Sequence, residues 1–291
     1  MQKETIQKIG IISPGAMGIS VAATMQRSGF DVYWASAGRS ANSVARAEEH
    51  NLIDARTVAN LCAECEAIVS VCPPHTAVTV AEEVLAAGFS GVYLDANAIA
   101  PQKVIQMAER MAAAGVVFVD GGIIGGPAWE PQSTWLYLSG EQAGLVASFF
   151  AAGPLETAVI GNKIGQASAL KMCFAAYSKG TTALLSMILA GAEALGVRAS
   201  LEEQWSRGGS DFAVQTQQRV CRVTVKAWRF EGEMYEIAAT FAGVGLPAGF
   251  HEAAADVYRR LAHFKEAEAT PELAEVLDSL LGEWGGDVFA N

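Results

Sequence analysis

The pattern of apolar and polar positions divides the chain into an alternating part and a helical part. Up to about residue 160, short apolar runs alternate with helical patterns, and we expect strands over 8–13, 31–35, 67–72, 91–95, 116–120, 134–139 and 157–160. Such alternation is typical of a mostly parallel, doubly wound sheet with helices on its faces. The first part of the chain is therefore predicted to be an α/β domain.

Strand signals fade after residue 160, and only helical patterns follow. The stretch from Ile164 to Leu195 contains no proline and predicts one long helix that joins two domains. Further helices are expected around 201–220, 231–244, 248–268 and 271–282, with breaks at Gly208-Gly209, Gly245-Leu246-Pro247 and Thr270-Pro271. We therefore predict an α/β domain over 1–162 and an all-helical domain over 163–291 that binds substrate and dimerises.

A glycine-containing turn follows the first predicted strand and leads into a helix. It consists of Ser13, Pro14, Gly15, Ala16, Met17 and Gly18. Gly15 and Gly18 hold the second and third glycine places of G-x-G-x-x-G, where the backbone approaches a pyrophosphate and the helix packs on its strand. Ser13 replaces the first glycine, so the match is incomplete. The turn predicts a Rossmann domain that binds a dinucleotide at the positive end of this helix.

The residues after the second predicted strand indicate which dinucleotide binds. An NAD site places an acid there for the ribose hydroxyls, whereas this chain has Ser36, Arg39 and Ser40 and no acid between them. A guanidinium with hydroxyl groups suits a 2′-phosphate through charge-assisted hydrogen bonds. We expect NADP to be preferred, with NAD as the alternative cofactor; a solvated loop charge is the competing interpretation of Arg39.

Composition narrows the class of protein further. The chain has 291 residues, a formal net charge of −11 and five scattered cysteines. An acidic balance disfavours nucleic acid, and dispersed cysteines are typical of a reducing compartment. No continuous apolar run reaches the ~20 residues of a membrane span, and no signal peptide is evident. Cys62 and Cys65 have redox-motif spacing, but no nearby His completes a metal site. We expect a cytoplasmic protein with a small-molecule substrate and no nucleic-acid, membrane or metal partner.

The order of motifs along the chain resembles the β-hydroxyacid dehydrogenase superfamily, which includes 6-phosphogluconate and 3-hydroxyisobutyrate dehydrogenases. After the glycine turn and the second-strand element, that superfamily has a Pro-containing loop, a D-x-[ST] strand end, a D-A-P-V-S-G-G loop and a lysine-bearing helix. The matching stretches here are Cys72-Pro73, Asp95-Ala96-Asn97, Asp120 to Pro127, and Gly161 to Lys171. In detail they look like one poorly characterised branch, labelled as NAD-binding 6-phosphogluconate dehydrogenase relatives.

The resemblance implies roles for individual residues. Lys171 would carry the proton, and Cys72, Pro73 and Asn97 would lie beside the cofactor. The substrate loop would offer backbone N–H groups to a carboxylate or carbonyl oxygen and consists of Gly121, Gly122, Ile123, Gly125 and Gly126. Lys179, eight residues after Lys171, is expected to bind a substrate carboxylate.

Departures from the superfamily pattern bear on the substrate. Ile124 stands in place of the loop serine, Ala175 in place of the asparagine after the lysine, and Gly232-Glu233-Met234 in place of K-D-L. Because polar anchors are missing, 6-phosphogluconate itself is not expected. Five aromatic residues would favour an apolar or aromatic substrate if they line the cleft: Trp129, Trp135, Phe174, Tyr177 and Trp205.

We therefore expect an NADP-preferring dehydrogenase or reductase that transfers a hydride between nicotinamide and the hydroxyl or carbonyl carbon of a small hydroxy acid-like substrate. An imine reductase is one alternative, since these enzymes resemble the fold but generally lack the lysine. A non-catalytic NADP(H)-binding sensor is the other, because of the missing anchors. A homodimer through the helical half is expected, where Met234, Ile237 and Phe241 repeat at helical spacing.

Overall fold

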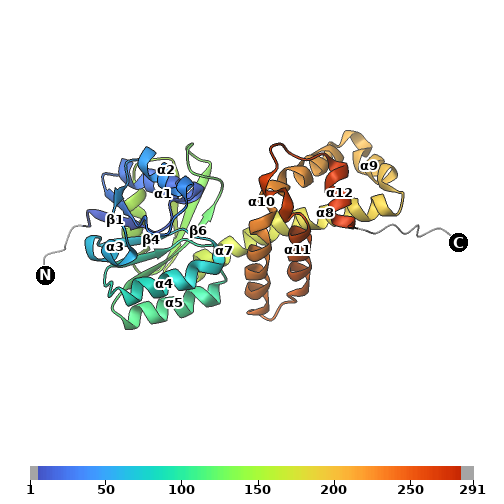
Figure 1. The fold of residues 1–291 in the computed structure, drawn as a ribbon. Helices are drawn as coiled ribbons and strands as arrows, with labels where there is room; N and C mark the ends of the chain where they lie inside the picture. The colour runs from blue at the N-terminus through green and yellow to red at the C-terminus, as the bar shows by residue number, and fades with distance from the viewer. Residues whose placement is uncertain (1–5, 283–291) are drawn as a thin grey trace. The chain divides into compact units, whose positions relative to one another are not determined.

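The computed structural model describes residues 6–282, and the chain divides into two compact units between Met172 and Cys173 (Figure 1). The first unit contains an eight-stranded sheet with the order β3-β2-β1-β4-β5-β6-β7-β8. Its strands are β1 (Lys8–Ile11), β2 (Asp31–Trp34), β3 (Ile53–Asp54), β4 (Ala67–Ser70), β5 (Val92–Asp95), β6 (Val117–Ile124), β7 (Thr134–Ser139) and β8 (Leu155–Gly161). All neighbours pair in parallel except β6 and β7. The predicted doubly wound, mostly parallel sheet is confirmed.

Helices cover both faces of this sheet (Figure 1). One face carries α1 (Ala16–Arg27), α2 (Ala41–Glu49), α6 (Ala143–Ala147) and the short turn η2 (Ser148–Phe150). The other carries α3 (Val58–Glu64), η1 (Pro74–Thr76), α4 (Ala77–Ala86) and α5 (Pro101–Ala113). Each face has its own apolar core: α1 buries Ile19 and Met25 on the first, and α5 buries Val104 and Met107 on the second. The strands are therefore covered on both sides, as their continuous apolar runs predict.

Two details of the sheet differ from the prediction. β3 contains just two residues and lies in a segment without an apolar run, so periodicity does not reveal it. The strand predicted to end at residue 120 continues to Ile124, because β7 pairs antiparallel with Gly121–Ile124. Gly121, Gly122 and Ile123 are thus strand residues, and their prediction as loop residues is wrong. Glycine is favoured there by close packing, since a Cβ on Gly121 would lie 3.0 Å from the carbonyl oxygen of Asp95.

The second unit is built from helices. The predicted long helix is present as α7 (Gln166–Ala175), which begins in the first unit, a π-helical turn η3 (Ala176–Gly180) and α8 (Thr181–Ala194). It is followed by α9 (Arg198–Ser206), η4 (Arg207–Gly209), α10 (Phe212–Ala242), α11 (Gly249–Arg260), η5 (Ala262–Glu266) and α12 (Leu273–Leu281).

The helix boundaries in this unit confirm one prediction and correct another. The break expected at Gly208-Gly209 is present between α9 and α10, where the two glycines take positive φ angles of 72° and 80°. The break expected between residues 220 and 231 does not exist, since α10 runs without interruption for 31 residues. Gly232 therefore lies inside a helix, where packing outweighs its low helix propensity.

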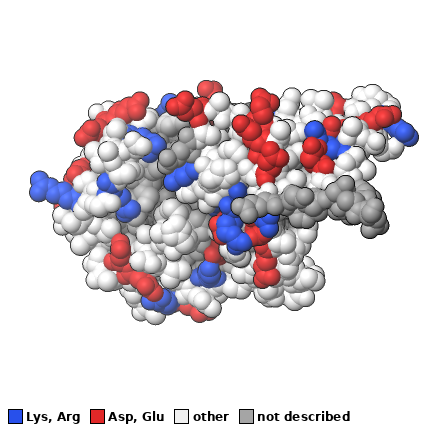
Figure 2. Space-filling model, turned by 45° about the vertical axis from the view of Figure 1, so that its right-hand side comes forward, with Lys and Arg blue, Asp and Glu red and all other residues white. Residues whose placement is uncertain are grey.

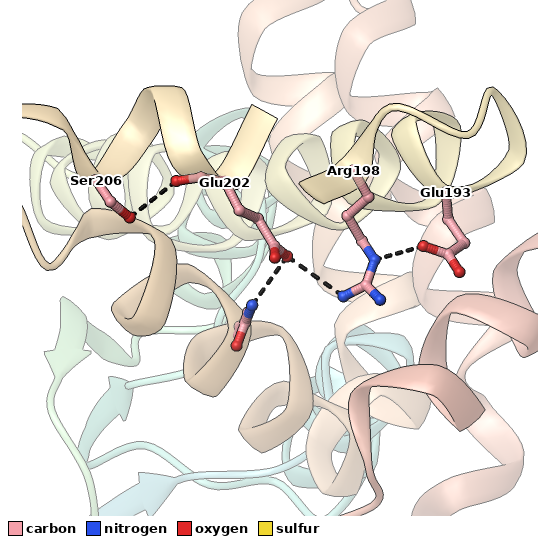
Figure 3. Close-up of polar contacts among 5 residues, drawn as sticks. Glu193, Arg198, Glu202 and Ser206 are labelled. Carbon is pink, nitrogen blue, oxygen red and sulfur yellow. Dashed lines mark hydrogen bonds and ion pairs between the residues drawn. The ribbon is translucent and has the colours of Figure 1, made fainter. Parts of the chain in front are cut away.

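Polar contacts hold α9 to its neighbours (Figure 3). Arg198 at the start of α9 pairs with Glu193 near the end of α8, and its second nitrogen lies 3.4 Å from Glu202. The same Glu202 carboxylate accepts a hydrogen bond of 2.9 Å from Gln217 on α10. No residue of the short helix α9 is fully buried, so these polar contacts, together with the ring of Trp205 against Phe212 on α10, hold it in place.

The residues that predicted a dimer face belong to the interior of the second unit. Met234 and Ile237 are fully buried within the single chain, and the ring of Phe241 packs on His251 with centroids 4.8 Å apart. Intramolecular packing explains the helical spacing of Met234 and Ile237, so this spacing gives no evidence of an intersubunit contact.

One described helical segment, Gln166–Ala194, is long and apolar enough to cross a membrane by length and composition alone, and 44% of its most apolar window is buried. This segment is not a continuous apolar run in the sequence, because Lys171 and Lys179 interrupt it. A core helix of a folded domain meets the same criteria.

On the face drawn in Figure 2, acidic and basic side chains are interspersed and not separated by sign.

Candidate functional site: one edge of the sheet in the first unit

The carboxyl ends of β1, β4, β5 and β6 lie at one edge of the sheet, because these strands are parallel. From β1 the chain proceeds outward to β2 and β3 and then returns to β4 on the other side of β1. Ligands of doubly wound sheets bind where the strand order reverses in this way. The segments singled out in the sequence, from Ser13 to Lys171, supply the strand ends and helix starts at this edge.

The glycine turn leaves the start of α1 open. Gly15 precedes the helix, and no side chain caps the first N–H groups of α1. A Cβ on Gly15 would have no atom within 4 Å, whereas a Cβ on Gly18 would lie 2.1 Å from the carbonyl oxygen of Ser13. Gly18 is therefore required for packing, and Gly15 borders free space. An uncapped helix start beside free space fits the pyrophosphate of a dinucleotide.

The segment after β2 combines a cation with one acid that the sequence did not reveal. The Ser36 hydroxyl donates to Asp54 at 2.8 Å, and Ser40 caps α2 by accepting from the Ser43 N–H at 3.3 Å. Asp54 ends β3, the strand that periodicity missed, and its register places it beside Trp34 at the end of β2. The absence of an acid between residues 36 and 40 is thus partly offset by Asp54.

Arg39 has an unused donor in this segment. The residue is half-buried, and its Nε atom is buried without a hydrogen-bond partner among the described residues. A buried donor left without a partner costs free energy, and a charged one costs more. The arrangement fits an anionic acceptor at Arg39, which a phosphate would provide.

Asn97 joins the ends of β4 and β5. Its carbonyl oxygen accepts from the Cys72 N–H at 2.6 Å, and its amide nitrogen donates to Ser70 at 3.1 Å and to Asp95 at 2.7 Å. Because Asn97 is 2% exposed and both amide hydrogens are used within the protein, the predicted contact with cofactor or substrate does not agree with this environment. Asn97 instead positions the loop that contains Cys72 and the exposed Pro73.

Asp95 is a titratable group inside this network. It is fully buried, and burial raises the pKa of Asp95 from 3.8 to about 7. The hydrogen bonds from Asn97 oppose this shift, and the charge of Asp120 on the paired strand adds to it. The carboxyl therefore changes its protonation near neutral pH.

Asp120 is the last residue of β6 that pairs with β5, and its side chain holds the start of α7. One carboxylate oxygen accepts from the Ser139 hydroxyl at 2.9 Å and from the N–H groups of Gly165, Ala167 and Ser168 at 2.9, 3.0 and 3.1 Å. The other accepts from the Ser168 hydroxyl at 2.5 Å. Burial raises the pKa of Asp120, although these hydrogen bonds favour the ionised form. A carboxylate at a helix N-terminus satisfies its free N–H groups and complements its dipole.

Lys171 lies directly against the glycines of β6. A Cβ on Gly122 would be 2.6 Å from the Ala167 carbonyl oxygen and 3.0 Å from the Lys171 Cβ. Only a glycine allows α7 to approach β6 this closely. Lys171, which is half-buried, therefore projects from a fixed base at the sheet edge that also carries the glycine turn.

The residues that directly follow β6 are exposed to solvent. Gly125 and Gly126 are exposed, Gly125 has a φ of 130°, and a Cβ on Gly126 would have no atom within 4 Å. Thr134 donates to the Gly126 carbonyl oxygen at 2.7 Å and holds the turn. Of the five predicted loop residues, only these two are exposed, and Gly126 borders open space, whereas a Cβ on Gly125 would lie 2.6 Å from the Ser133 carbonyl oxygen.

Lys179 is described within the second unit and already has a partner. Its ammonium forms an ion pair with Glu233, and the two side chains are 12% and 11% exposed. The same nitrogen lies 4.6 Å from the centre of the Phe230 ring. The expectation that Lys179 binds a substrate carboxylate does not agree with this environment, because Glu233 already neutralises its charge.

The comparisons with known proteins follow the division of the chain. Residues 8–147 match the family described as the NAD binding domain of 6-phosphogluconate dehydrogenase, and residues 192–261 match a domain of unknown function, DUF1932. No curated protein sequence matches the chain.

Solved structures with the same fold include dehydrogenases and imine-reducing enzymes. A 3-hydroxyisobutyrate dehydrogenase from Mycobacterium tuberculosis has a TM-score of 0.68 and 19% identity over 96% of this chain and 100% of its own. An imine reductase from Streptomyces aurantiacus has a TM-score of 0.53 and 18% identity, over 94% and 99%. A reductive aminase from Aspergillus terreus, solved with NADPH and ethyl levulinate, has a TM-score of 0.56 and 19% identity, also over 94% and 99%.

The glycine turn, the strand order and the family match over residues 8–147 define a Rossmann domain that binds a nicotinamide dinucleotide. These solved structures share the fold of this chain, and among them is the 3-hydroxyisobutyrate dehydrogenase, which aligns over both of its units.

Proposed function

We propose that the chain is an NADP-preferring oxidoreductase that acts on the hydroxyl or carbonyl carbon of a small hydroxy acid-like substrate with an apolar or aromatic body. The contact of Lys171 with Gly122 carries this proposal, because it fixes a proton-carrying side chain at the sheet edge that bears the nucleotide turn. Asp120 supports it by tying the start of α7 to β6.

The positions of these residues give each of them a role in the proposed reaction. A bound nicotinamide cofactor would accept or supply the hydride. The N–H groups at the start of α1, beside Gly15, would bind its pyrophosphate. Lys171 would donate a proton to a carbonyl oxygen in reduction or accept one from a hydroxyl in oxidation. The open turn at Gly125 and Gly126 would orient the substrate through backbone N–H groups.

Imine reduction is the second candidate. It is supported by the shared fold of the solved imine reductase and reductive aminase, and by Ile124 and Ala175, which replace polar substrate anchors. Lys171 favours oxygen chemistry, since imine reductases generally lack a lysine at this position. A panel of hydroxy acids, ketones or aldehydes, and cyclic imines, assayed with NADPH and NADP, separates the two. Turnover of imines without any alcohol oxidation would select the second candidate.

The cofactor preference rests on Arg39 and is tested by binding alone. We expect wild-type protein to bind NADPH more tightly than NADH, and Arg39→Ala to lose ~1.5–3 kcal/mol of NADPH affinity, the value of a hydrogen bond to a charged group. Dissociation constants are measured by NADPH fluorescence. Arg27→Ala, at the far end of α1, is the control. Equal wild-type affinities for the two cofactors would refute the preference, and Asp54 is the residue that would explain them.

A further inference from the structure

The second unit contains a groove of its own between α8 and α10. Its volume is about 530 Å³, and it is open to solvent. Thr182 and Leu185 contribute from α8, and the rest of the lining comes from α10, between Phe212 and Phe230. No residue assigned above to the cofactor or to proton transfer belongs to this lining.

The lining of the groove is cationic. Arg219, Arg222 and Lys226 follow one another at three- and four-residue spacing, which places them on one face of α10. The lining contains no Asp or Glu, and none of the three cations forms an ion pair with a described residue. Like charges on one helix face repel each other, so an anion in the groove would relieve an existing cost.

The hydrogen bonds of these cations go to neutral groups. Arg219 donates to the Thr182 hydroxyl at 2.6 Å and to the Ser178 carbonyl oxygen at 2.5 Å. Arg222 donates to the side chain of Gln218 at 2.7 Å. Glu202, which reaches α10 through Gln217, is already paired with Arg198 (Figure 3). The charge of the groove therefore stays uncompensated by the described part of the chain.

A buried hydroxyl in the groove also lacks a partner. Thr216 is 1% exposed and lines the groove, and its Oγ1 atom makes no hydrogen bond to a described residue. Buried polar groups are normally paired, so an unpaired hydroxyl in a cavity wall points to a ligand atom.

The groove has apolar walls as well. Leu185, Phe212, Val223 and Phe230 lie in the same lining as the cations. An inorganic ion would leave this apolar surface in contact with water, whereas an alkyl or aryl body would cover it. We propose that the groove binds an amphipathic monocarboxylate, with its carboxylate toward Arg222 and Lys226 and its apolar body against the aromatic and aliphatic wall. This inference does not depend on the proposed oxidoreductase activity.

The experiment is a calorimetric titration of the full chain, without cofactor, with 4-phenylbutyrate, 4-phenylbutan-1-ol and inorganic phosphate. We expect 4-phenylbutyrate to bind at least about tenfold more tightly than the other two, because only it has both a charge and an apolar body. The double variant Arg222→Gln/Lys226→Gln should lose at least about tenfold in affinity.

Two control variants test whether the binding of 4-phenylbutyrate depends on the groove. Arg207→Gln removes one exposed charge from the same unit outside the groove and should bind 4-phenylbutyrate as wild type does. Arg39→Ala, which tests the proposed cofactor preference, should also bind it unchanged, so the two proposals fail separately. The proposal is overturned if 4-phenylbutyrate does not bind, if the alcohol or phosphate binds as tightly, or if Arg207→Gln weakens binding as much as the double variant. It is also overturned if the double variant alters the oligomeric state while wild type binds none of the probes.

Discussion

Asp95 and Asp120 face each other in the register of β5 and β6 and have different surroundings. Among residues 6–282, Asp120 accepts five hydrogen bonds, whereas Asp95 accepts from Asn97 alone, through its N–H and its side chain. Both carboxyls are fully buried. The poorer hydrogen bonding of Asp95 leaves the cost of burying its charge largely uncompensated, and its titration should therefore be visible in the stability of the protein.

The stability of the folded chain should fall as pH rises from about 4 to 7. Burial raises the pKa of Asp95 to about 7, so in this range the folded state retains a proton that the unfolded chain has released. Each unit of pH lowers the free energy of unfolding by about 1.4 kcal/mol for one such group, and the effect ends above the folded pKa. Asp95→Asn removes this titration, so its stability relative to wild type should improve as pH rises.

Urea unfolding of wild type, Asp95→Asn and the exposed control Glu109→Gln at pH 5, 6, 7 and 8 measures this change. A difference between wild type and Asp95→Asn that stays constant with pH would contradict the assignment.

At the residue scale, the sequence predicts those features that depend on neighbouring residues. Gly15 and Gly18 act through their own backbone and the adjoining turn, and the motif reveals them. Asp120 is paired with residues 45 to 48 positions away, and Lys179 with Glu233 54 positions away. No local pattern identifies such partners, which is why the roles of Asp120 and Lys179 emerge only from the fold.

At the scale of elements, the contact between α7 and β6 is the part of the site that depends most on packing. Gly122 lets the helix lie against the strand, and Asp120 fixes the first turn of the helix. Long apolar runs and the proline-free stretch predicted both elements. Their contact could not be predicted, because the strand extension through Gly121 and Gly122 depends on pairing with β7 and not on intrinsic strand propensity.

Gly122→Ala should push α7 away from β6. The added Cβ would meet backbone at 2.6 Å, which a side-chain rotation cannot relieve. We expect a loss of about 1–3 kcal/mol in the free energy of unfolding, typical of overpacking, and a fall in kcat of about 10–100-fold from displacement of Lys171. NADPH affinity should stay unchanged, since the glycine turn lies on another strand.

Gly144→Ala in α6 is the matched control, because a Cβ there meets no atom within 4 Å. It should leave kcat unchanged and stability equal or slightly higher. A Gly122→Ala protein with normal stability and normal kcat would show that α7 is not held by this contact.

At the scale of the whole molecule, we propose a homodimer formed through α8. Met234 and Ile237, whose spacing in the sequence predicts an apolar helix face, are buried inside the unit. By contrast, α8 exposes the side chains of Leu184, Met187 and Ile188 by 45%, 50% and 37%. Their spacing places them on one helix face. An apolar stripe of this kind is typical of a contact surface.

Light scattering at micromolar concentration should therefore give the mass of a dimer, and Leu184→Glu/Met187→Glu should give a monomer. Leu145→Glu, which places a charge at a 41% exposed apolar position of the first unit, should remain dimeric. A monomeric wild-type chain would contradict the proposed assembly.

The central claim, that Lys171 carries the proton, is tested most directly by kcat of Lys171→Ala on the substrate found in the panel, measured together with the NADPH dissociation constant. We predict a fall in kcat of ~10²–10⁴, the usual contribution of a general acid–base group, with NADPH affinity nearly unchanged. Lys163→Ala, an exposed lysine just before α7, should behave as wild type. A Lys171→Ala enzyme with near-normal kcat, while Lys179→Ala abolishes turnover, would contradict the assignment.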